Sequence, residues 1–319
     1  MKKIILSSLV TVIIVAAGIL AAAGYFIGDY FVNFALRRGN NLDSSAPPQA
    51  LTVAFAGQEW YKRTAVPRPR AASENWQLTS RDGLKLAATH FEPAQESHQW
   101  AILVHGYGCN QTYMWNMARA YLRNGYQVLT PDMRASGQSE GLYITMGARE
   151  SDDLALWAAQ IAREDPEAKI VLHGVSMGAA AVLLASAQAL PPQVTALVED
   201  SGYTNAYAMF ANQMQSLFNL PAFPLLDCAN YMAQKRTGVK FTEASPLTAV
   251  RNTHLPTLFI HGAEDRMVPP AMMQELYNAS SAPVKEELVV SKAGHAMAYV
   301  VDPKTYFTKV FAFTDKYTG

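Results

Sequence analysis

Short apolar runs alternate with longer amphipathic stretches from residue 75 to the end of the chain. Consecutive apolar residues predict buried strands at residues 100–104, 126–130, 169–172, 194–198, 255–260 and 287–290. Helical spacing of apolar residues predicts helices at residues 114–123, 149–163 and 304–313. The turn Asp82-Gly83 predicts a hairpin between residues 76–80 and 84–91. A hairpin followed by strands alternating with helices predicts an α/β fold with a mostly parallel sheet and helices on both faces.

The N-terminal residues have a different pattern. Residues 4–28 contain no charged side chain and follow Lys2 and Lys3. As a helix they would extend about 37 Å, which is enough to cross a bilayer with some tilt. Ala21-Ala22-Ala23 is an alternative, a signal-peptidase site that would release a secreted protein. Because the apolar run continues past Ala23, we expect an uncleaved transmembrane anchor.

Basic residues flank the apolar run on both sides, Lys2 and Lys3 before it and Arg37 and Arg38 after it. The order of a signal sequence favours a cytoplasmic N-terminus, and therefore a single-pass cell-membrane protein whose main domain is extracytoplasmic. Residues 29–72 begin with an amphipathic continuation of the helix and end in an extended linker at Pro67-Arg68-Pro69-Arg70. A further helix is predicted at residues 51–61.

Residues 202–250 interrupt the alternation of strands and helices with a helical insertion rich in large apolar residues. We expect most of these side chains to form a small core of the insertion's own. Because the insertion follows a strand, it begins at the carboxyl edge of the sheet, where it can cover a site as a lid. The predicted organisation is an anchor or signal segment, a linker segment, and a core divided by the helical cap: residues 1–28, 29–72, 73–201, 202–250 and 251–319.

Composition narrows the classes of function. The 319 residues include 26 Lys and Arg against 26 Asp and Glu, so the formal net charge does not favour nucleic-acid binding. The two cysteines, Cys109 and Cys228, are far apart in sequence, and a disulfide between them is not expected. Neither these cysteines nor the seven histidines have metal-ligand spacing, and we expect no metal and no cofactor. The sequence does not indicate an oligomeric state.

The strongest motif is Gly174-Val175-Ser176-Met177-Gly178, which lies between an apolar run and a stretch of small residues. Gly-x-Ser-x-Gly between a strand and a helix is the nucleophile elbow, a strained turn that exposes a serine hydroxyl above the edge of a sheet. Ser176 is therefore the candidate nucleophile.

A serine nucleophile needs an imidazole to take its proton and a carboxylate to orient that imidazole. Asp265 follows the strand predicted to end at residue 260, and His295 follows the last predicted strand. The order Ser176, Asp265, His295 is the one expected for this type of site. Glu264 and Asp200 are alternative acids, and His261 is expected to be structural. Asp132 and Arg134 are expected to pair and order their loop.

These motifs together resemble the α/β-hydrolase superfamily, over residues 75–319. The resemblance rests on the elbow, on His261-Gly-Ala-Glu-Asp265-Arg-Met-Val-Pro269 and on Gly294-His295. With the lysine-led apolar N-terminus, the chain is similar to bacterial membrane-anchored serine hydrolases of the prolyl-oligopeptidase-like and acylaminoacyl-peptidase-like group. The resemblance implies an oxyanion hole formed by the backbone N–H groups of Tyr107 and Met177.

The expected activity is hydrolysis of a carboxylic ester, or of an amide or peptide bond, through an acyl-Ser176 intermediate. The substrate is then a small acyl ester or a peptide, and the apolar insertion favours short to medium or aromatic acyl groups. Two alternatives stay open. The same triad would serve an acyltransferase, and the same scaffold would serve a catalytically silent binding protein.

Overall fold

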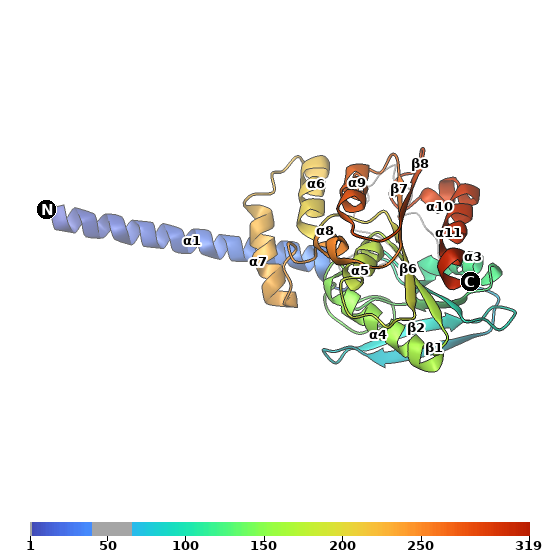
Figure 1. Cartoon of the computed structure of the whole chain (residues 1–319). Helices are drawn as coiled ribbons and strands as arrows, with labels where there is room; N and C mark the ends of the chain where they lie inside the picture. The colour runs from blue at the N-terminus through green and yellow to red at the C-terminus, as the bar shows by residue number, and fades with distance from the viewer. Residues whose placement is uncertain (1, 40–65) are drawn as a thin grey trace.

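The computed structural model describes residues 2–39 and 66–319, so the helix predicted at residues 51–61 lies outside the described residues (Figure 1). An eight-stranded sheet lies at the centre of the body, with strand order β1-β2-β4-β3-β5-β6-β7-β8. The strands are β1 (Ser73–Thr79), β2 (Lys85–Phe91), β3 (Gln99–Val104), β4 (Gln127–Pro131), β5 (Lys169–Val175), β6 (Val194–Asp200), β7 (Thr257–Gly262) and β8 (Lys285–Val290).

The sheet is antiparallel at one end and parallel elsewhere. β1 pairs with β2, and β2 pairs with β4, in antiparallel fashion. The remaining neighbours in the sheet, β4–β3, β3–β5, β5–β6, β6–β7 and β7–β8, pair in parallel fashion. β4 follows β3 in the chain but lies between β2 and β3 in the sheet. The prediction of a mostly parallel sheet that follows an antiparallel hairpin is confirmed.

Helices cover both faces of this sheet. They are α3 (Trp115–Arg123), α4 (Ala148–Glu164), α5 (Met177–Ala185), α9 (Pro270–Ala279), α10 (Ala298–Val301) and α11 (Pro303–Thr318), with short 3₁₀ turns at Gln111–Met114 and Val250–Asn252. Successive residues of β5 point to opposite faces: Leu172 packs in one core cluster with Trp157 of α4, and Val171 in another with Phe313 of α11. All four residues of this example are buried, which is why β5 is apolar at the consecutive positions 170–172.

The N-terminal helix α1 (Lys2–Leu36) continues beyond the predicted apolar segment and ends inside the body of the protein. Its N-terminal part projects away from the body (Figure 1), with exposed apolar side chains such as Ile14 and Leu20. Its last turns are packed, because Val32 and Leu36 are 0% and 1% exposed. The stretch Thr11–Leu36 is long and apolar enough to cross a membrane.

The insertion between β6 and β7 contains α6 (Ala206–Phe218), α7 (Leu225–Thr237) and α8 (Pro246–Ala249). α7 crosses α1 closely: a Cβ added at Gly28 would lie 2.4 Å from the backbone oxygen of Cys228. The prediction that the insertion has a small core of its own is wrong. Its buried side chains, such as Met209 and Leu226, belong to the same apolar cluster as the sheet, because the insertion lies directly on the body.

Candidate active site

The turn after β5 holds Ser176 in a strained conformation, with φ 57° and ψ −118°. The backbone crossing at this turn allows no side chain at either flanking glycine. A Cβ at Gly174 would lie 2.2 Å from the oxygen of Gly178, and one at Gly178 would lie 2.2 Å from the oxygen of Val104. These contacts explain why the motif needs glycine two residues before and two residues after the serine.

Three turns at the carboxyl ends of β5, β7 and β8 bring Ser176, Asp265 and His295 into one row. The Nε2 atom of His295 lies 2.8 Å from Oγ of Ser176, and its Nδ1 atom lies 2.7 Å from Oδ2 of Asp265. Asp265 and His295 are each 4% exposed. Asp265 and Ser176 are 30 and 119 positions from His295 along the chain, so the folding of the sheet is what brings the three residues together.

Asp265 is held as a carboxylate by its surroundings. Its Oδ1 atom accepts hydrogen bonds from the backbone N–H groups of Met267 and Val268, both at 2.9 Å. Burial opposes ionisation, but the charge of His295 and hydrogen bonds from His261 and His295 outweigh it and hold the pKa of Asp265 well below its usual range. The acid that faces the imidazole is therefore charged at neutral pH.

The alternative acids lie elsewhere. Asp200 is buried, but its Oδ2 atom accepts a hydrogen bond from the hydroxyl of Tyr306 at 2.8 Å, and its Oδ1 atom accepts one from Ser201 at 2.9 Å. Glu264 is exposed to solvent. Neither carboxylate occupies the position beside His295 that Asp265 holds.

His261 is a second buried histidine in contact with Asp265. Its Nε2 atom donates to the backbone oxygen of Val268 at 2.8 Å and lies 3.2 Å from Oδ2 of Asp265. His261 and His295 therefore both contact the Oδ2 atom of Asp265. Burial lowers the pKa of His261, but the hydrogen bond to Asp265 and the charge of that carboxylate outweigh burial and raise the pKa.

Glu199 is a buried acid that sequence reasoning did not single out. It is fully buried near the end of β6, its Oε2 atom accepts a hydrogen bond from the N–H of Gly202 at 2.9 Å, and burial raises its pKa to about 8. Its Oε1 atom and Nδ1 of His261 are buried without a hydrogen-bond partner among the described residues. The sequence signal that could have identified Glu199 is a charged residue at the end of an otherwise apolar strand.

Two backbone N–H groups beside Ser176 are the predicted oxyanion donors. Met177 is the first residue of α5, where a helix leaves its N–H groups without intrahelical acceptors. Tyr107 follows β3 in a loop that passes close to the serine, because a Cβ at the adjacent Gly106 would lie 3.3 Å from Cβ of Ser176. The Tyr107 hydroxyl donates to the backbone oxygen of Ala35 in α1 at 2.6 Å, which fixes this loop against the N-terminal helix.

An apolar cavity of about 340 Å³ opens onto the row, with Ser176 and His295 among its lining residues. The insertion contributes residues from α6 and α7, including Met209, Phe210 and Leu226. α1 contributes a further wall that the sequence analysis did not assign to the site, formed by Phe31, Phe34 and Ala35. The helical spacing of these three residues was the available signal.

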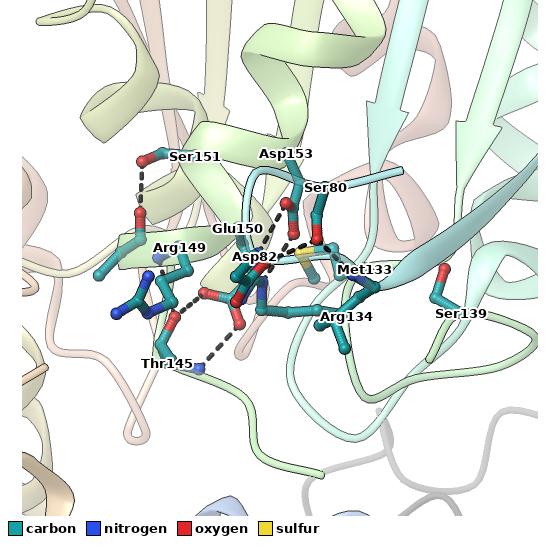
Figure 2. A network of polar contacts seen from close by, with 12 residues as sticks. Ser80, Asp82, Met133, Arg134, Ser139, Thr145, Arg149, Glu150, Ser151 and Asp153 are labelled. Carbon is teal, nitrogen blue, oxygen red and sulfur yellow. Dashed lines mark hydrogen bonds and ion pairs between the residues drawn. The ribbon is translucent and has the colours of Figure 1, made fainter. Parts of the chain in front are cut away.

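The loop after β4 is fixed by a charged network, but not the predicted one. Arg134 does not pair with Asp132. Its Nε atom lies 2.7 Å from Oδ2 of Asp153 on α4, and its Nη1 atom lies 2.9 Å from Oδ2 of Asp82 in the β1–β2 turn (Figure 2). Asp132 instead accepts backbone hydrogen bonds, for example from Gln111 at 2.8 Å. The prediction failed because both partners of Arg134 are distant in sequence.

No group of three or more His, Cys, Asp and Glu side chains within residues 2–39 and 66–319 is arranged to hold a metal ion. A serine, a carboxylate and an imidazole on the loops after β5, β7 and β8, at the carboxyl edge of a mostly parallel sheet, are typical of the α/β-hydrolase fold.

The chain belongs to the alpha/beta hydrolase family, whose family model matches residues 101–308. This confirms the resemblance inferred from the motifs. The uncharacterized protein YqkD of Bacillus subtilis (strain 168) is 27% identical over 239 residues, which cover 75% of this chain and 78% of YqkD. The uncharacterized protein YfhR of Escherichia coli (strain K12) is 24% identical over 232 residues, covering 72% of this chain and 75% of YfhR.

Solved structures share the fold. An esterase of Pyrococcus furiosus, Pf2001, superposes with a TM-score of 0.65 at 24% identity, over 80% of this chain and 99% of the esterase. An acylaminoacyl peptidase of Pyrococcus horikoshii superposes with a TM-score of 0.56 at 19% identity, over 78% of this chain and 41% of the peptidase. At these identities the similarity establishes the fold alone.

Proposed function

We propose that the protein is a serine hydrolase that cleaves carboxylic esters through an acyl-Ser176 intermediate. The observation that carries this proposal is the continuous row of hydrogen-bonding distances, 2.8 Å from Ser176 to His295 and 2.7 Å from His295 to Asp265. The strained backbone at Ser176 and the adjoining apolar cavity support the same assignment.

In the first step, Oγ of Ser176 attacks the ester carbonyl carbon and its proton passes to Nε2 of His295. The carboxylate of Asp265 accepts a hydrogen bond from Nδ1, keeps the ring in the correct tautomer and stabilises the imidazolium. The C–O bond between the acyl carbon and the alcohol oxygen then breaks, and the departing alkoxide takes from His295 the proton that Ser176 had given up. Water repeats the sequence on the acyl-enzyme, which releases the carboxylic acid and restores Ser176.

The negative charge that develops on the carbonyl oxygen requires preorganised donors. We assign this role to the backbone N–H groups of Tyr107 and Met177. Support comes from the position of Met177 at the start of α5, where the helix dipole also favours negative charge, and from the proximity of the Tyr107 loop to Ser176.

The test is hydrolysis of p-nitrophenyl esters by the full chain in detergent. Ser176→Ala should lower kcat by about 10⁴-fold or more and abolish labelling by a fluorophosphonate probe. Ser216→Ala, at an exposed serine of α6, is the matched control and should behave as the unsubstituted protein. Wild-type turnover in Ser176→Ala would refute the assignment. Product analysis with an added alcohol distinguishes hydrolysis from acyl transfer to that alcohol.

We further propose that α1 is an uncleaved membrane anchor and that the rest of the chain is extracytoplasmic. Support comes from the length and exposed apolar side chains of its N-terminal part, and from the unbroken helix across Ala21-Ala22-Ala23. The protein should stay with membranes after alkaline carbonate extraction, and mass spectrometry should find peptides that span Ala21-Ala22-Ala23 uncleaved. Cleavage by protease added to intact spheroplasts should confirm the orientation.

A further inference from the structure

The N-terminal helix is both the apolar segment that projects from the body and a wall of the active-site cavity. Thr11–Leu36 can cross a membrane, and Phe31, Phe34 and Ala35 at the end of the same segment line the cavity that contains Ser176. Asp29 is the first charged residue after Lys3. Along the helix, Asp29 and Ala35 are separated by only about 9 Å. The cavity therefore begins close to where an anchored chain leaves the bilayer.

Several contacts fix α1 relative to the catalytic row. The carboxylate of Asp29 lies 2.7 Å from the guanidinium of Arg236 on α7, and Oδ1 of Asn33 accepts a hydrogen bond from the Tyr143 hydroxyl at 2.8 Å. The hydroxyl of Tyr107, the residue assigned to the oxyanion hole, donates to the backbone of α1. The cavity thus has a defined position relative to the membrane-crossing part of the chain.

Exposed apolar side chains lie on the insertion as well as on α1. Phe223 and Tyr231 are 75% and 53% exposed, and Leu220 is 39% exposed although it also lines the cavity. Leu220 therefore marks a place where the cavity wall reaches the surface. In Figure 1, α6 and α7 lie on the side of the body from which α1 projects. Aromatic residues at such a boundary are typical of membrane interfaces, and α1 adds Tyr30.

We propose that the substrate is an acyl ester of a membrane glycerolipid, and that its acyl chain enters the cavity from the bilayer where Leu220, in the segment between α6 and α7, reaches the surface. This inference rests on the proposed serine hydrolase activity. An acyl chain suits the apolar walls, and it can pass from the hydrocarbon layer into the cavity beside α1 without crossing water. A water-soluble ester would not require the anchoring helix to form part of the cavity.

The reaction is ester hydrolysis at the glycerol oxygen. Ser176 forms a bond to the acyl carbon, the bond from that carbon to the glycerol oxygen breaks, and the glycerol oxygen takes the proton from His295. Water then cleaves acyl-Ser176. The products are one fatty acid and a glycerolipid that has one acyl chain fewer.

The experiment uses the full chain reconstituted in phosphatidylcholine vesicles. One sample contains phosphatidylcholine labelled in its oleoyl chains, and the other contains labelled dioleoylglycerol in unlabelled phosphatidylcholine. Release of labelled oleate is measured beside hydrolysis of p-nitrophenyl acetate by the same vesicles. We expect oleate release in at least one sample, and the two samples identify whether a phosphate headgroup is accepted.

The variant Ala35→Phe adds a ring to the cavity wall that α1 contributes. We expect its rate of oleate release to fall by about tenfold or more relative to its rate of acetate hydrolysis, because the longer chain needs the obstructed space. Ile19→Ala is the matched control on α1, since Ile19 is exposed and does not line the cavity. Its ratio of the two rates should match that of the unsubstituted protein.

The outcomes separate the two proposals. Fluorophosphonate labelling and acetate hydrolysis without oleate release from either sample would overturn the lipid substrate and leave the serine hydrolase assignment standing. Absence of labelling as well would overturn both. A rate ratio in Ala35→Phe equal to that of Ile19→Ala would overturn the role of α1 in receiving the acyl chain.

Discussion

We expect Glu199 to carry a proton at neutral pH, because it is buried and its Oε1 atom has no hydrogen-bond partner among the described residues. Its folded-state pKa is about 8, against an ordinary value of 4.5. The charged groups that act on it are His261, which favours its ionisation, and Asp200, which opposes it. Between about pH 4.5 and pH 8 the folded chain holds this proton and the unfolded chain does not. The free energy of unfolding therefore falls as the pH rises through this window.

The variant Glu199→Gln should remove most of this pH dependence. A glutamine amide can still accept the hydrogen bond from Gly202, and it does not titrate. At pH 8 the gain in the free energy of unfolding should reach about 5 kcal/mol at most, at about 1.4 kcal/mol for each tenfold change in proton affinity. His261, whose pKa is also raised, contributes a slope of the same sign, so some pH dependence should persist.

The measurement is the melting temperature of the full chain in detergent from pH 5 to pH 8. Glu264→Gln, at an exposed neighbour of Asp265, is the control and should follow the unsubstituted protein. A profile for Glu199→Gln as steep as that of the unsubstituted protein would contradict a protonated Glu199.

At the scale of elements, Arg134 ties the loop after β4 to α4 and to the β1–β2 turn. Arg134 and Asp153 are 4% and 5% exposed in their side chains, whereas Asp82 is 40% exposed. The hydrogen bond from Arg134 lowers the pKa of Asp82 to about 2. Stability from this contact is thus fully present above pH 3.8 and is lost as the pH falls toward 2.

Arg134→Leu should lower the free energy of unfolding by about 3–5 kcal/mol, because it leaves Asp153 buried without its partner. Arg81→Leu is the matched control, since Arg81 is 67% exposed and its nearest contact with Asp152 is 3.7 Å. It should change stability by less than about 0.5 kcal/mol. Chemical denaturation measures the free energy of unfolding of both variants and of the unsubstituted protein. Adding Asp153→Leu to Arg134→Leu should restore part of the loss.

The close crossing of α1 and α7 leads to a second prediction at the scale of elements. Gly28→Val would place side-chain atoms against the backbone oxygen of Cys228 and force the two helices apart. We expect a loss of about 1–3 kcal/mol and faster proteolysis within residues 202–250. Gly18→Val, where a Cβ meets nothing within 4 Å, should leave the proteolysis pattern unchanged. Equal rates of cleavage in the two variants would contradict a close α1–α7 contact.

The sequence predicted most elements because their signals are local. The apolar run at residues 169–172 and the small residues after Gly178 identify β5 and α5 without reference to any distant residue. The position of β4 between β2 and β3, the partners of Arg134 and the contribution of Phe34 to the cavity depend on contacts between distant segments. The expectation of short to medium acyl groups considered the insertion alone and omitted the wall from α1.

For the whole molecule, the packed end of α1 should matter for folding as well as for location. A chain that starts at Gly24 keeps Val32 and Leu36, which are buried in the body, whereas a chain that starts at Asn40 loses both. The shorter chain should be less stable by about 1.5–3 kcal/mol for each side chain lost. Thermal unfolding and hydrolysis of p-nitrophenyl acetate measure the difference. Equal melting temperatures would show that α1 is not part of the core.

The hydrogen bond from Tyr107 to α1 has an acceptor in the main chain. Ala35 lies in the last turn of α1, where carbonyl groups have no intrahelical donor, and the Tyr107 hydroxyl supplies one. The bond therefore does not depend on which amino acid occupies position 35. Substitutions that keep α1 helical, including changes to its exposed apolar side chains, should therefore leave the joint between the helix and the Tyr107 loop intact.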